Sequence, residues 1–264
     1  MPAPDPLIHL HHVDKQFPGG LQALAGVSLA VRGGEFVALL GPSGCGKSTV
    51  LRLAAGLESP STGTLAAPAR SASGGSDTAF VFQEPTLMPW ATVFDNVWLP
   101  LRLQGQGRSQ AAPAVRAVLA RVGLAGFETA HPAQLSGGMK MRASIARALV
   151  TQPRVLLMDE PFAALDDITR QALNADLLQW WHAAGNMAAL FVTHSVAEAV
   201  FLSQRVLVMA ARPGRVVAEL AIDAPYPRPA SFRHSAAFTD HCRQLGGALA
   251  AAHSAAHGAA SPAA

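Results

Sequence analysis

The sequence predicts an α/β protein with a mostly parallel sheet, an antiparallel β-portion near the N-terminus and an inserted helical subdomain. Three observations support this class: Val/Leu-rich runs alternating with helical patterns in the C-terminal half, glycine-punctuated apolar runs in residues 7–37, and a helical segment at about residues 84–150. Strands that alternate with helices indicate βαβ units, whose parallel strands are buried on both faces. With 264 residues, half of them hydrophobic, the chain can form one sizeable core and a smaller subdomain.

The N-terminal elements are expected to be β-hairpins followed by a helix. The apolar runs LIHLHHV, GVSLAV and EFVALL are separated by glycine turns. KSTVLRLAAGL then has helical spacing and Gly56 near its end. Residues 59–79 are rich in Ser, Gly, Ala and Pro, so they are expected to be loop around one weak strand near residues 63–65.

The rest of the chain is expected to hold helices first and then the parallel strands. SQAAPAVRAVLARVGL, with Ser109 as its N-cap, and GMKMRASIARALVT have helical periodicity. The runs RVLLMDE, AALFVTH and RVLVMAA predict buried strands between helical patterns. We expect one domain over residues 1–240 and a low-complexity, disordered tail over residues 241–264.

Charge and hydropathy exclude several classes of protein. The net charge is only +3 and Lys and Arg are not clustered, so no nucleic-acid partner is expected. No apolar run reaches the ~18–20 residues of a membrane span, and the N-terminus lacks the pattern of a signal peptide. Cys45 and Cys242 lie far apart without metal-ligand spacing, which favours a reducing cytosol. A membrane role would therefore act through a partner.

The segment GPSGCGKST, residues 41–49, fits the pattern GxxxxGK[ST] between an apolar strand and a helix. Glycine lets successive backbone N–H groups surround phosphate oxygens, and the helix start adds positive potential. Lys47 would reach the β- and γ-phosphates, and the Ser48 hydroxyl would bind Mg²⁺. The predicted nucleotide-binding loop comprises Gly41, Pro42, Ser43, Gly44, Cys45, Gly46, Lys47, Ser48 and Thr49.

A second motif, RVLLMDE, places two carboxylates at the end of a predicted strand. Asp159 suits Mg²⁺ coordination, and Glu160 could polarise an attacking water. The alternative is an acidic pair that caps the helix start before Pro161. Since a phosphate loop precedes the pair in the chain, we expect the catalytic role.

The third motif is LSGGMKMRASIARAL, residues 135–149, in which LSGG opens an amphipathic helix and makes a second potential anion site. One mononucleotide needs one phosphate loop, so a second site is surplus unless two chains share nucleotides. With this motif the sequence resembles the ATP-binding cassette (ABC) transporter ATPases. The phosphate loop, LSGG and LLMDE follow that family's order and approximate spacing, and the resemblance covers residues from about 7 to 240. It implies a P-loop NTPase core that binds ATP and Mg²⁺.

The resemblance also implies a head-to-tail homodimer, in which each ATP lies between one phosphate loop and the other subunit's signature. Ser136, Gly137 and Gly138 would then contact the γ-phosphate across the interface, and Ser136 would also be an ordinary N-cap. Asp166, in AALDD, matches the aspartate that faces the opposite subunit.

Three further positions match functional residues of the family. Gln83 in VFQEP matches a glutamine that senses the γ-phosphate and Mg²⁺, and His194 after ALFVT matches the switch histidine at the γ-phosphate. Phe17 in KQFPGG lies where the family places an aromatic ring on adenine. The alternatives are a solvated loop amide for Gln83, a core residue for His194, and a core or loop residue for Phe17.

Two positions depart from the family pattern. Met139 replaces the frequent Gln after LSGG and lacks the hydrogen bonds of an amide, and Ala163 replaces a frequent Ser before ALD. Neither change removes a charged catalytic group.

Two other features have competing interpretations. His9, His11 and His12 are expected on a solvent-facing strand rather than in a metal site, because no carboxylate completes the set. The apolar segment LMPWATVFDNVWLPL, which contains Trp90, matches the family's surface for the membrane subunit, and core packing is the alternative.

The resemblance implies an ATPase subunit at the cytoplasmic face of the inner membrane, with Lys47, Gln83, Glu160 and His194 in the catalytic machinery. EPFAALDDITR, ARPGRVVAELAID and APYPRP resemble the importers of nitrate, sulfonates and taurine, a group that includes transporters of thiamine precursors. Its partners would be transmembrane permease subunits and, indirectly, a periplasmic or extracellular substrate-binding protein. A soluble ABC ATPase acting on the ribosome or DNA, and a P-loop nucleotide kinase, are the alternatives.

Overall fold

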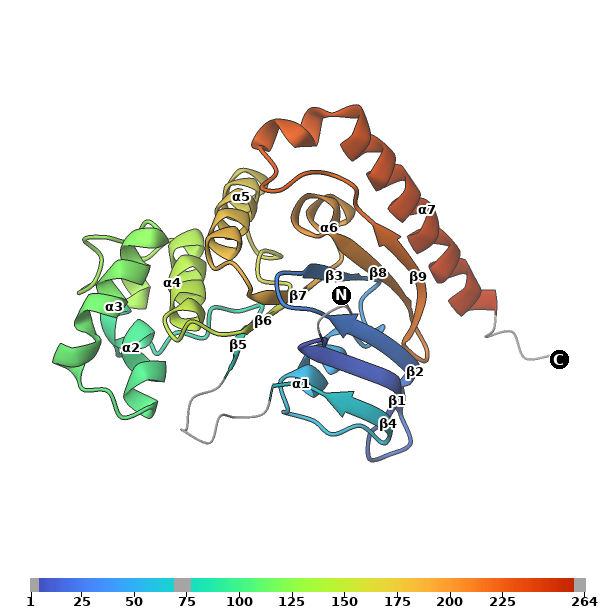
Figure 1. The fold of residues 1–264 in the computed structure, drawn as a ribbon, viewed down its shortest axis with the longest axis horizontal. Coiled ribbons are helices and arrows are strands. Elements are labelled where there is room, and N and C mark those ends of the chain that lie inside the picture. Colours follow the sequence, from blue (N-terminus) through green and yellow to red (C-terminus); the bar gives the residue numbers. More distant parts are fainter. Residues whose placement is uncertain (1–4, 69–76, 259–264) are drawn as a thin grey trace. The chain divides into compact units, whose positions relative to one another are not determined.

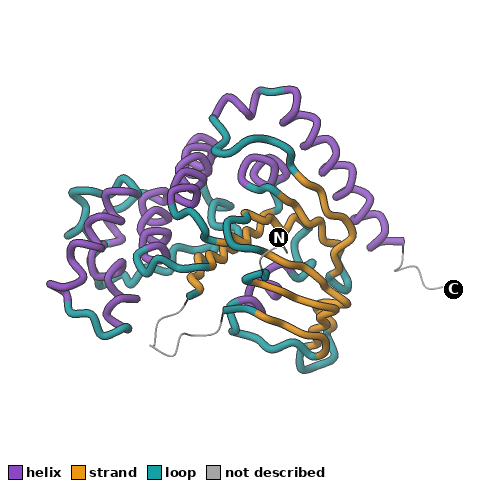
Figure 2. Tube along the Cα trace, viewed as in Figure 1, coloured by secondary structure: helices purple, strands orange, loops and turns teal. Residues whose placement is uncertain are grey.

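The computed structural model describes residues 5–68 and 77–258. Its elements divide into two compact units, residues 1–67 with 188–264 and residues 68–187. Both units combine helices and strands (Figure 2), so the predicted α/β class is confirmed. No helix in the described ranges is both long and apolar enough to cross a membrane.

The first unit contains the predicted antiparallel β-portion near the N-terminus (Figure 1). Its three strands lie in the order β2-β1-β4 and are β1 (Ile8–Gln16), β2 (Gln22–Val31) and β4 (Thr62–Ala66). Both pairs are antiparallel. In β1, Ile8 and Leu10 are buried and alternate with exposed residues, because successive side chains of a strand face opposite sides.

The three histidines of β1 are exposed, as predicted. His9 and His11 share the solvent face, and a bulge at His12, where φ is +49°, exposes the third ring as well. Within residues 5–68 and 77–258 no group of three or more His, Cys, Asp or Glu side chains has a geometry that could hold a metal ion.

The parallel strands of the first unit are buried except for Arg205 at the start of β8, and β3 and β7 lead into the site described below. β3 (Phe36–Leu40) lies between β7 (Ala188–Thr193) and β8 (Arg205–Ala210) and is parallel to both. The apolar run at β3 therefore joins the parallel sheet and not an N-terminal hairpin, because its side chains are buried on both faces. An unpredicted strand, β9 (Arg215–Ala221), pairs antiparallel with β8.

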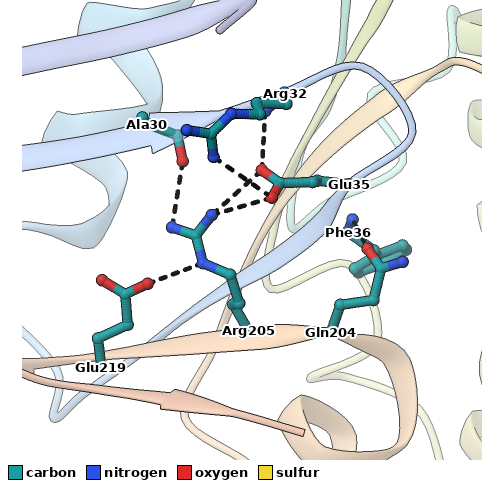
Figure 3. Close-up of polar contacts among 7 residues, drawn as sticks. All are labelled: Ala30, Arg32, Glu35, Phe36, Gln204, Arg205 and Glu219. Atoms are coloured by element: carbon teal, nitrogen blue, oxygen red, sulfur yellow. Dashed lines mark hydrogen bonds and ion pairs between the residues drawn. The ribbon is translucent and has the colours of Figure 1, made fainter. Parts of the chain in front are cut away.

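A polar cluster joins the beginnings of β3 and β8 (Figure 3). Arg205 Nη1 lies 3.1 Å and 3.2 Å from the two carboxylate oxygens of Glu35, and its Nε donates to Glu219 at 2.7 Å. Gln204 Oε1 accepts from the backbone N–H of Phe36 at 2.8 Å. Because these groups sit at the strand starts, they help to fix the register of the buried strands whose opposite ends carry functional loops.

The helices of the first unit are interspersed with its strands in the chain. They are α1 (Lys47–Ala54), α6 (Val196–Leu202), the 3₁₀ helix η2 (Ala230–His234) and α7 (Ala236–Gly258). The segment from β7 through α6 to β8 is thus a strand, a helix and a strand, as the sequence predicts.

The C-terminal tail differs from the expected disorder. Residues 241–258 belong to α7, which packs against β8 and α6 (Figure 1) and buries Leu245 and Ala252. Alanine has the highest intrinsic helix propensity, so an alanine-rich segment with apolar contacts forms a helix although its composition is simple. The part of the tail at residues 259–264 lies outside the described residues.

The second unit contains two parallel strands and the helical segment. β5 (Thr78–Val81) pairs with β6 (Val155–Asp159). The helices are α2 (Val93–Leu103), α3 (Arg108–Arg121), the 3₁₀ helix η1 (Pro132–Gln134), α4 (Gly137–Leu149) and α5 (Asp167–Ala183). α2 packs against both α3 and α4. α3 begins at Arg108 with Gly107 as its N-cap, so the prediction of Ser109 as the cap is wrong by two residues.

Candidate functional site

The predicted nucleotide-binding loop, residues 41–49, turns the chain from β3 into α1. Gly44 and Gly46 have φ values of +77° and +92°, a backbone region that glycine enters without steric cost. Gly46 is the N-cap of α1, so the first turn of that helix begins at Lys47 and includes Ser48 and Thr49. The exposed middle of the loop, Ser43 and Gly44, follows half-buried Pro42. The backbone N–H groups of a glycine-rich turn and a helix start form an anion-binding arrangement.

Lys47 is held inside this loop. Its side chain is almost fully buried, at 4% exposure, and Nζ donates hydrogen bonds to the carbonyls of Gly41 at 2.8 Å and Pro42 at 3.0 Å. These bonds fix an ammonium group beside the backbone that would surround phosphate oxygens. The Lys47 ammonium is therefore already positioned. Its side chain would lose little conformational entropy on binding an anion.

Gly214, which is far from the nucleotide-binding loop in the sequence, packs closely against the backbone of that loop at Cys45. A Cβ on Gly214 would lie 2.8 Å from the carbonyl oxygen of Ala23 and closer still to that of Cys45. The backbone of Gly214 also donates to Ala23 at 3.0 Å and accepts from Ala25 at 2.9 Å. Gly214 is not among the site residues that the sequence predicts. Its only local sequence signal is the Pro-Gly pair in ARPGR, which indicates a turn.

Phe17 opens the turn between β1 and β2, where its N–H donates to Leu21 O at 2.9 Å. One face of the half-buried ring carries Lys15, whose Nζ is 5.0 Å from the ring centroid. Three residues beyond Leu21, Leu24 approaches the phosphate loop, since a Cβ on Gly46 would lie 2.5 Å from Leu24 Cδ2. The start of β2 thus joins the Phe17 turn to the loop.

His194 leaves the parallel sheet at the same edge as the loop. Leu40 and Thr193, the last residues of β3 and β7, are register partners, so Gly41 and His194 follow neighbouring strand ends. The imidazole is exposed and stands on a turn fixed by hydrogen bonds of its neighbours: Thr193 Oγ1 donates to Glu198 at 2.5 Å and accepts from the N–H of Ser195 at 2.9 Å. The first unit therefore brings the loop and His194 to one edge.

The second unit gathers the predicted carboxylates and Gln83 at one strand edge. Val81 and Met158 are register partners, so Asp159 at the end of β6 and Glu160 after it lie at the strand edge at which Gln83 follows β5. Asp159 and Glu160 are half-buried and Gln83 is exposed. Glu160 has φ of +44°, a costly conformation for a non-glycine residue that is typical of functional sites.

The signature motif and Asp166 lie at two neighbouring helix starts in the second unit. Ser136 caps α4, with Oγ accepting from Met139 N–H at 3.3 Å, and Asp166 caps α5, accepting from Thr169 N–H at 3.0 Å. The backbone and side-chain hydrogen bonds from Thr169 lower the pKa of Asp166, because they stabilise its ionised form. The N-cap alternative for Ser136 is thus realised, and it remains compatible with nucleotide contact.

Gly138 allows these two helix starts to approach. A Cβ at this position would lie 2.8 Å from Thr169 Cγ2, closer than carbon atoms tolerate, whereas a Cβ on Gly137 would lie 3.6 Å from Leu165 Cδ2 in ordinary contact. The second glycine of LSGG therefore has a packing role in addition to any nucleotide contact.

This packing predicts a rescue experiment. Gly138→Ala should lower the free energy of unfolding by about 1–3 kcal/mol through overpacking, and adding Thr169→Ser should restore most of it, because serine keeps the hydroxyl and removes Cγ2. Urea denaturation measures both effects, with Gly137→Ala as the matched control that should not destabilise. A double variant no more stable than Gly138→Ala would contradict the role of Thr169.

The segment around Trp90 divides between surface and core. Trp90 is 78% exposed, whereas Val93, Phe94 and Val97 on the following helix α2 are buried. The core-packing interpretation is therefore confirmed for these three residues of α2, and Trp90 lies on the surface.

Comparisons with known proteins agree with this geometry. The model of the ABC transporter family matches residues 24–163, more than half of the chain. A taurine import ATP-binding protein of Burkholderia pseudomallei is 47% identical over 206 residues, covering 78% of this chain and 79% of that protein. A nitrate import ATP-binding protein of Synechocystis is 45% identical over 208 residues, covering 78% of each.

A solved structure is also similar. The dimeric structure of a bacterial ABC transporter cassette aligns with a TM-score of 0.69 at 29% identity, covering 83% of this chain and 100% of the other. The chain belongs to the ATP-binding cassette (ABC) transporter family and is an ATPase subunit of that family.

Proposed function

We propose that this ATPase powers import of a small solute through a membrane transporter of the nitrate, sulfonate and taurine type, which includes thiamine-precursor transporters. The names of the taurine and nitrate relatives support this subtype. Membership of the ABC family removes the nucleotide-kinase alternative. The observation that carries the proposal is the pair of packed helix starts at Ser136 and Asp166, which would supply a second phosphate-facing surface besides the phosphate loop.

Two copies of the chain would use that surface on each other. Each ATP would lie between the phosphate loop of one subunit and Ser136, Gly137 and Gly138 of the other, with Asp166 facing the opposite subunit. The dimeric arrangement of the similar cassette supports this pairing. Phe17 would stack on adenine with the ring face that Lys15 does not cover.

The residues present fit a magnesium nucleotide. The loop offers backbone N–H groups and the buried ammonium of Lys47, while the Ser48 hydroxyl, the Asp159 carboxylate and the Gln83 amide oxygen are oxygen ligands of the kind that Mg²⁺ prefers. When bound, Mg²⁺ would neutralise charge on the phosphates.

The protein's own groups would carry the hydrolysis. Glu160, held at the end of β6, would take the proton of the attacking water as general base. Lys47 would stabilise negative charge on the transferred phosphoryl group, and His194 would contact the γ-phosphate from the neighbouring strand end.

The transport partners follow from this mechanism. Closing and reopening of the ATPase dimer would move transmembrane permease subunits, with exposed Trp90 on the surface that they contact. A periplasmic or extracellular binding protein would select the solute, and the ATPase would be peripheral at the cytoplasmic face of the inner membrane.

The Glu160→Gln variant tests this function. It should bind ATP but lose turnover by about 100-fold or more, because the water loses its base, and it should therefore accumulate as an ATP-dependent dimer. Light scattering with and without ATP measures the dimer, and affinity purification from membranes identifies a multi-span partner. Asp167→Asn on the exposed start of α5 is the control and should leave turnover near wild type.

The possible outcomes separate the alternatives. A Glu160→Gln chain that remains monomeric with ATP and retains no membrane subunit would exclude the transporter function. Co-purification with ribosomes or DNA instead would favour a soluble ABC ATPase.

A further inference from the structure

The loop between β5 and α2, residues 82–92, has neither helix nor strand but is firmly held by side chains. It begins next to Gln83 and displays Trp90, so it contains both a predicted site residue and the most exposed aromatic ring among the described residues. We call it the connecting loop. The side chains that hold it, those of Asn96 and Arg147, belong to the same second unit.

The second half of the connecting loop is fixed by Asn96 of α2. The Asn96 amide is fully buried, accepts from Met88 N–H at 2.7 Å, and donates to the carbonyls of Met88 and Ala91 at 3.2 Å. This side chain belongs to the helix that directly follows the loop, so it ties the loop to its own continuation.

The first half is fixed by Arg147, which belongs to a different element. Arg147 Nη1 donates to Thr86 O at 2.8 Å, and Nη2 donates to Pro85 O at 2.8 Å and to Thr86 Oγ1 at 2.9 Å. Three hydrogen bonds from one guanidinium use its planar donor fork, which a lysine ammonium cannot reproduce. Burial lowers the pKa of the Arg147 guanidinium, which remains charged at neutral pH.

Thr86, which accepts hydrogen bonds from Arg147, has an unfavourable backbone conformation. Its φ is +47°, in the left-handed region that a β-branched residue rarely adopts. Such a conformation persists only where surrounding contacts determine it. Two of the hydrogen bonds from Arg147 reach Thr86 itself and the third reaches the preceding residue, Pro85.

Arg147 lies near the C-terminal end of α4, and the signature residues Ser136, Gly137 and Gly138 form the N-terminal end of the same helix. α4 begins at its N-cap Ser136, and Arg147 follows in the last turn, about three helical turns or ~16 Å further on. A short α-helix with an intact hydrogen-bond ladder is stiff, so a displacement at one end moves the other. α4 therefore connects the connecting loop physically to Ser136, Gly137 and Gly138.

We propose that Arg147 is a positioning residue that clamps the connecting loop to α4, so that the loop after Gln83 and the signature move as one body. The effect of this clamp on ATP-dependent dimerisation rests on the proposed function, in which the signature of one subunit contacts the nucleotide of the other. A force on Trp90 or on Gln83 is then delivered to the signature through Pro85, Thr86 and Arg147.

The test combines Arg147→Lys with two measurements on the full chain. The first is hydrogen–deuterium exchange across the connecting loop, residues 82–92, whose first half Arg147 holds at Pro85 and Thr86. The second, in the Glu160→Gln background, is the ATP concentration that gives half-maximal dimerisation. We expect about tenfold faster exchange and an about tenfold higher ATP requirement, the effect of losing hydrogen bonds to a charged group.

Two controls distinguish positioning from general loss of stability. ATP affinity of the monomer, measured with a fluorescent ATP analogue, should stay at the wild-type value, because the phosphate loop belongs to the other unit. Arg243→Lys changes an exposed arginine that pairs with Asp240 on α7 of the first unit, and it should change neither measurement. Arg147→Met is the stronger variant, and Arg147→Lys decides the test where Arg147→Met does not fold.

Two results would overturn the proposal. Unchanged exchange across residues 82–92 would exclude the clamp, and faster exchange there with an unchanged ATP requirement would exclude transmission to the signature. A Glu160→Gln chain with Arg147 intact that does not dimerise would instead refute the proposed function, and the exchange measurement would still test the clamp.

Discussion

Replacing Lys47 with methionine is expected to lower ATP turnover by about 100- to 1,000-fold, the usual effect of removing one preorganised donor from a site of developing negative charge. Methionine keeps much of the length and volume of the lysine stem but has no ammonium group. The hydrogen bonds that hold the loop carbonyls of Gly41 and Pro42 would disappear with it. Both turnover and ATP affinity should therefore fall.

Steady-state phosphate release and titration with a fluorescent ATP analogue measure these two effects separately. Arg52→Met is the matched control, because Arg52 is an exposed cation in the last turn of the same helix, α1. Turnover within threefold of wild type in Lys47→Met would contradict the assignment of Lys47 to the phosphate site.

Gly214→Ala should weaken ATP binding although this residue lies far from the phosphate loop in the sequence. The added Cβ would meet the backbone carbonyls of Cys45 and Ala23, at 2.8 Å from the latter, and a backbone atom cannot move aside as a side chain does. The turn before β9 or the phosphate loop must therefore shift. We expect about 1–3 kcal/mol lower stability from overpacking and at least tenfold weaker ATP binding, which corresponds to ~1.4 kcal/mol.

Urea denaturation without nucleotide and ATP titration distinguish the two consequences. Gly246→Ala in α7 is the control, since a Cβ there meets nothing within 4 Å, and it should leave ATP affinity unchanged. If Gly214→Ala is destabilised but binds ATP normally, the support of the loop by Gly214 would be refuted. Unlike Gly138, this position offers no compensating substitution, because the obstructing atoms belong to the main chain.

Local sequence signals predicted the elements that carry the phosphate loop. The apolar run of β3, the glycines of residues 41–46 and the periodicity of α1 lie next to one another in the chain, so one short segment specifies strand, turn and helix. The same holds for Asp159 and Glu160 after β6. Ser136 was predicted as an N-cap for the same reason, because a capping hydroxyl acts on a backbone N–H only three residues away.

The sequence was less informative about the structure of the alanine-rich tail and about which strands β3 pairs with. The alanine-rich tail has a simple composition that is typical of disorder, and its helix α7 depends on burial of residues such as Leu245. The pairing of β3 with β7 and β8, rather than in a hairpin, also follows from long-range contacts.

By itself the sequence predicted the family, the phosphate loop, the two carboxylates and the signature, because each of these motifs is specified by residues within one short segment. Only the tertiary structure decided that Gly214 supports the loop, that Thr169 requires glycine at position 138, and that Arg147 holds Pro85 and Thr86. These contacts join residues separated by tens to more than a hundred positions. No periodicity or turn propensity encodes such a contact, because it arises only when packing brings distant backbone segments within van der Waals or hydrogen-bond distance.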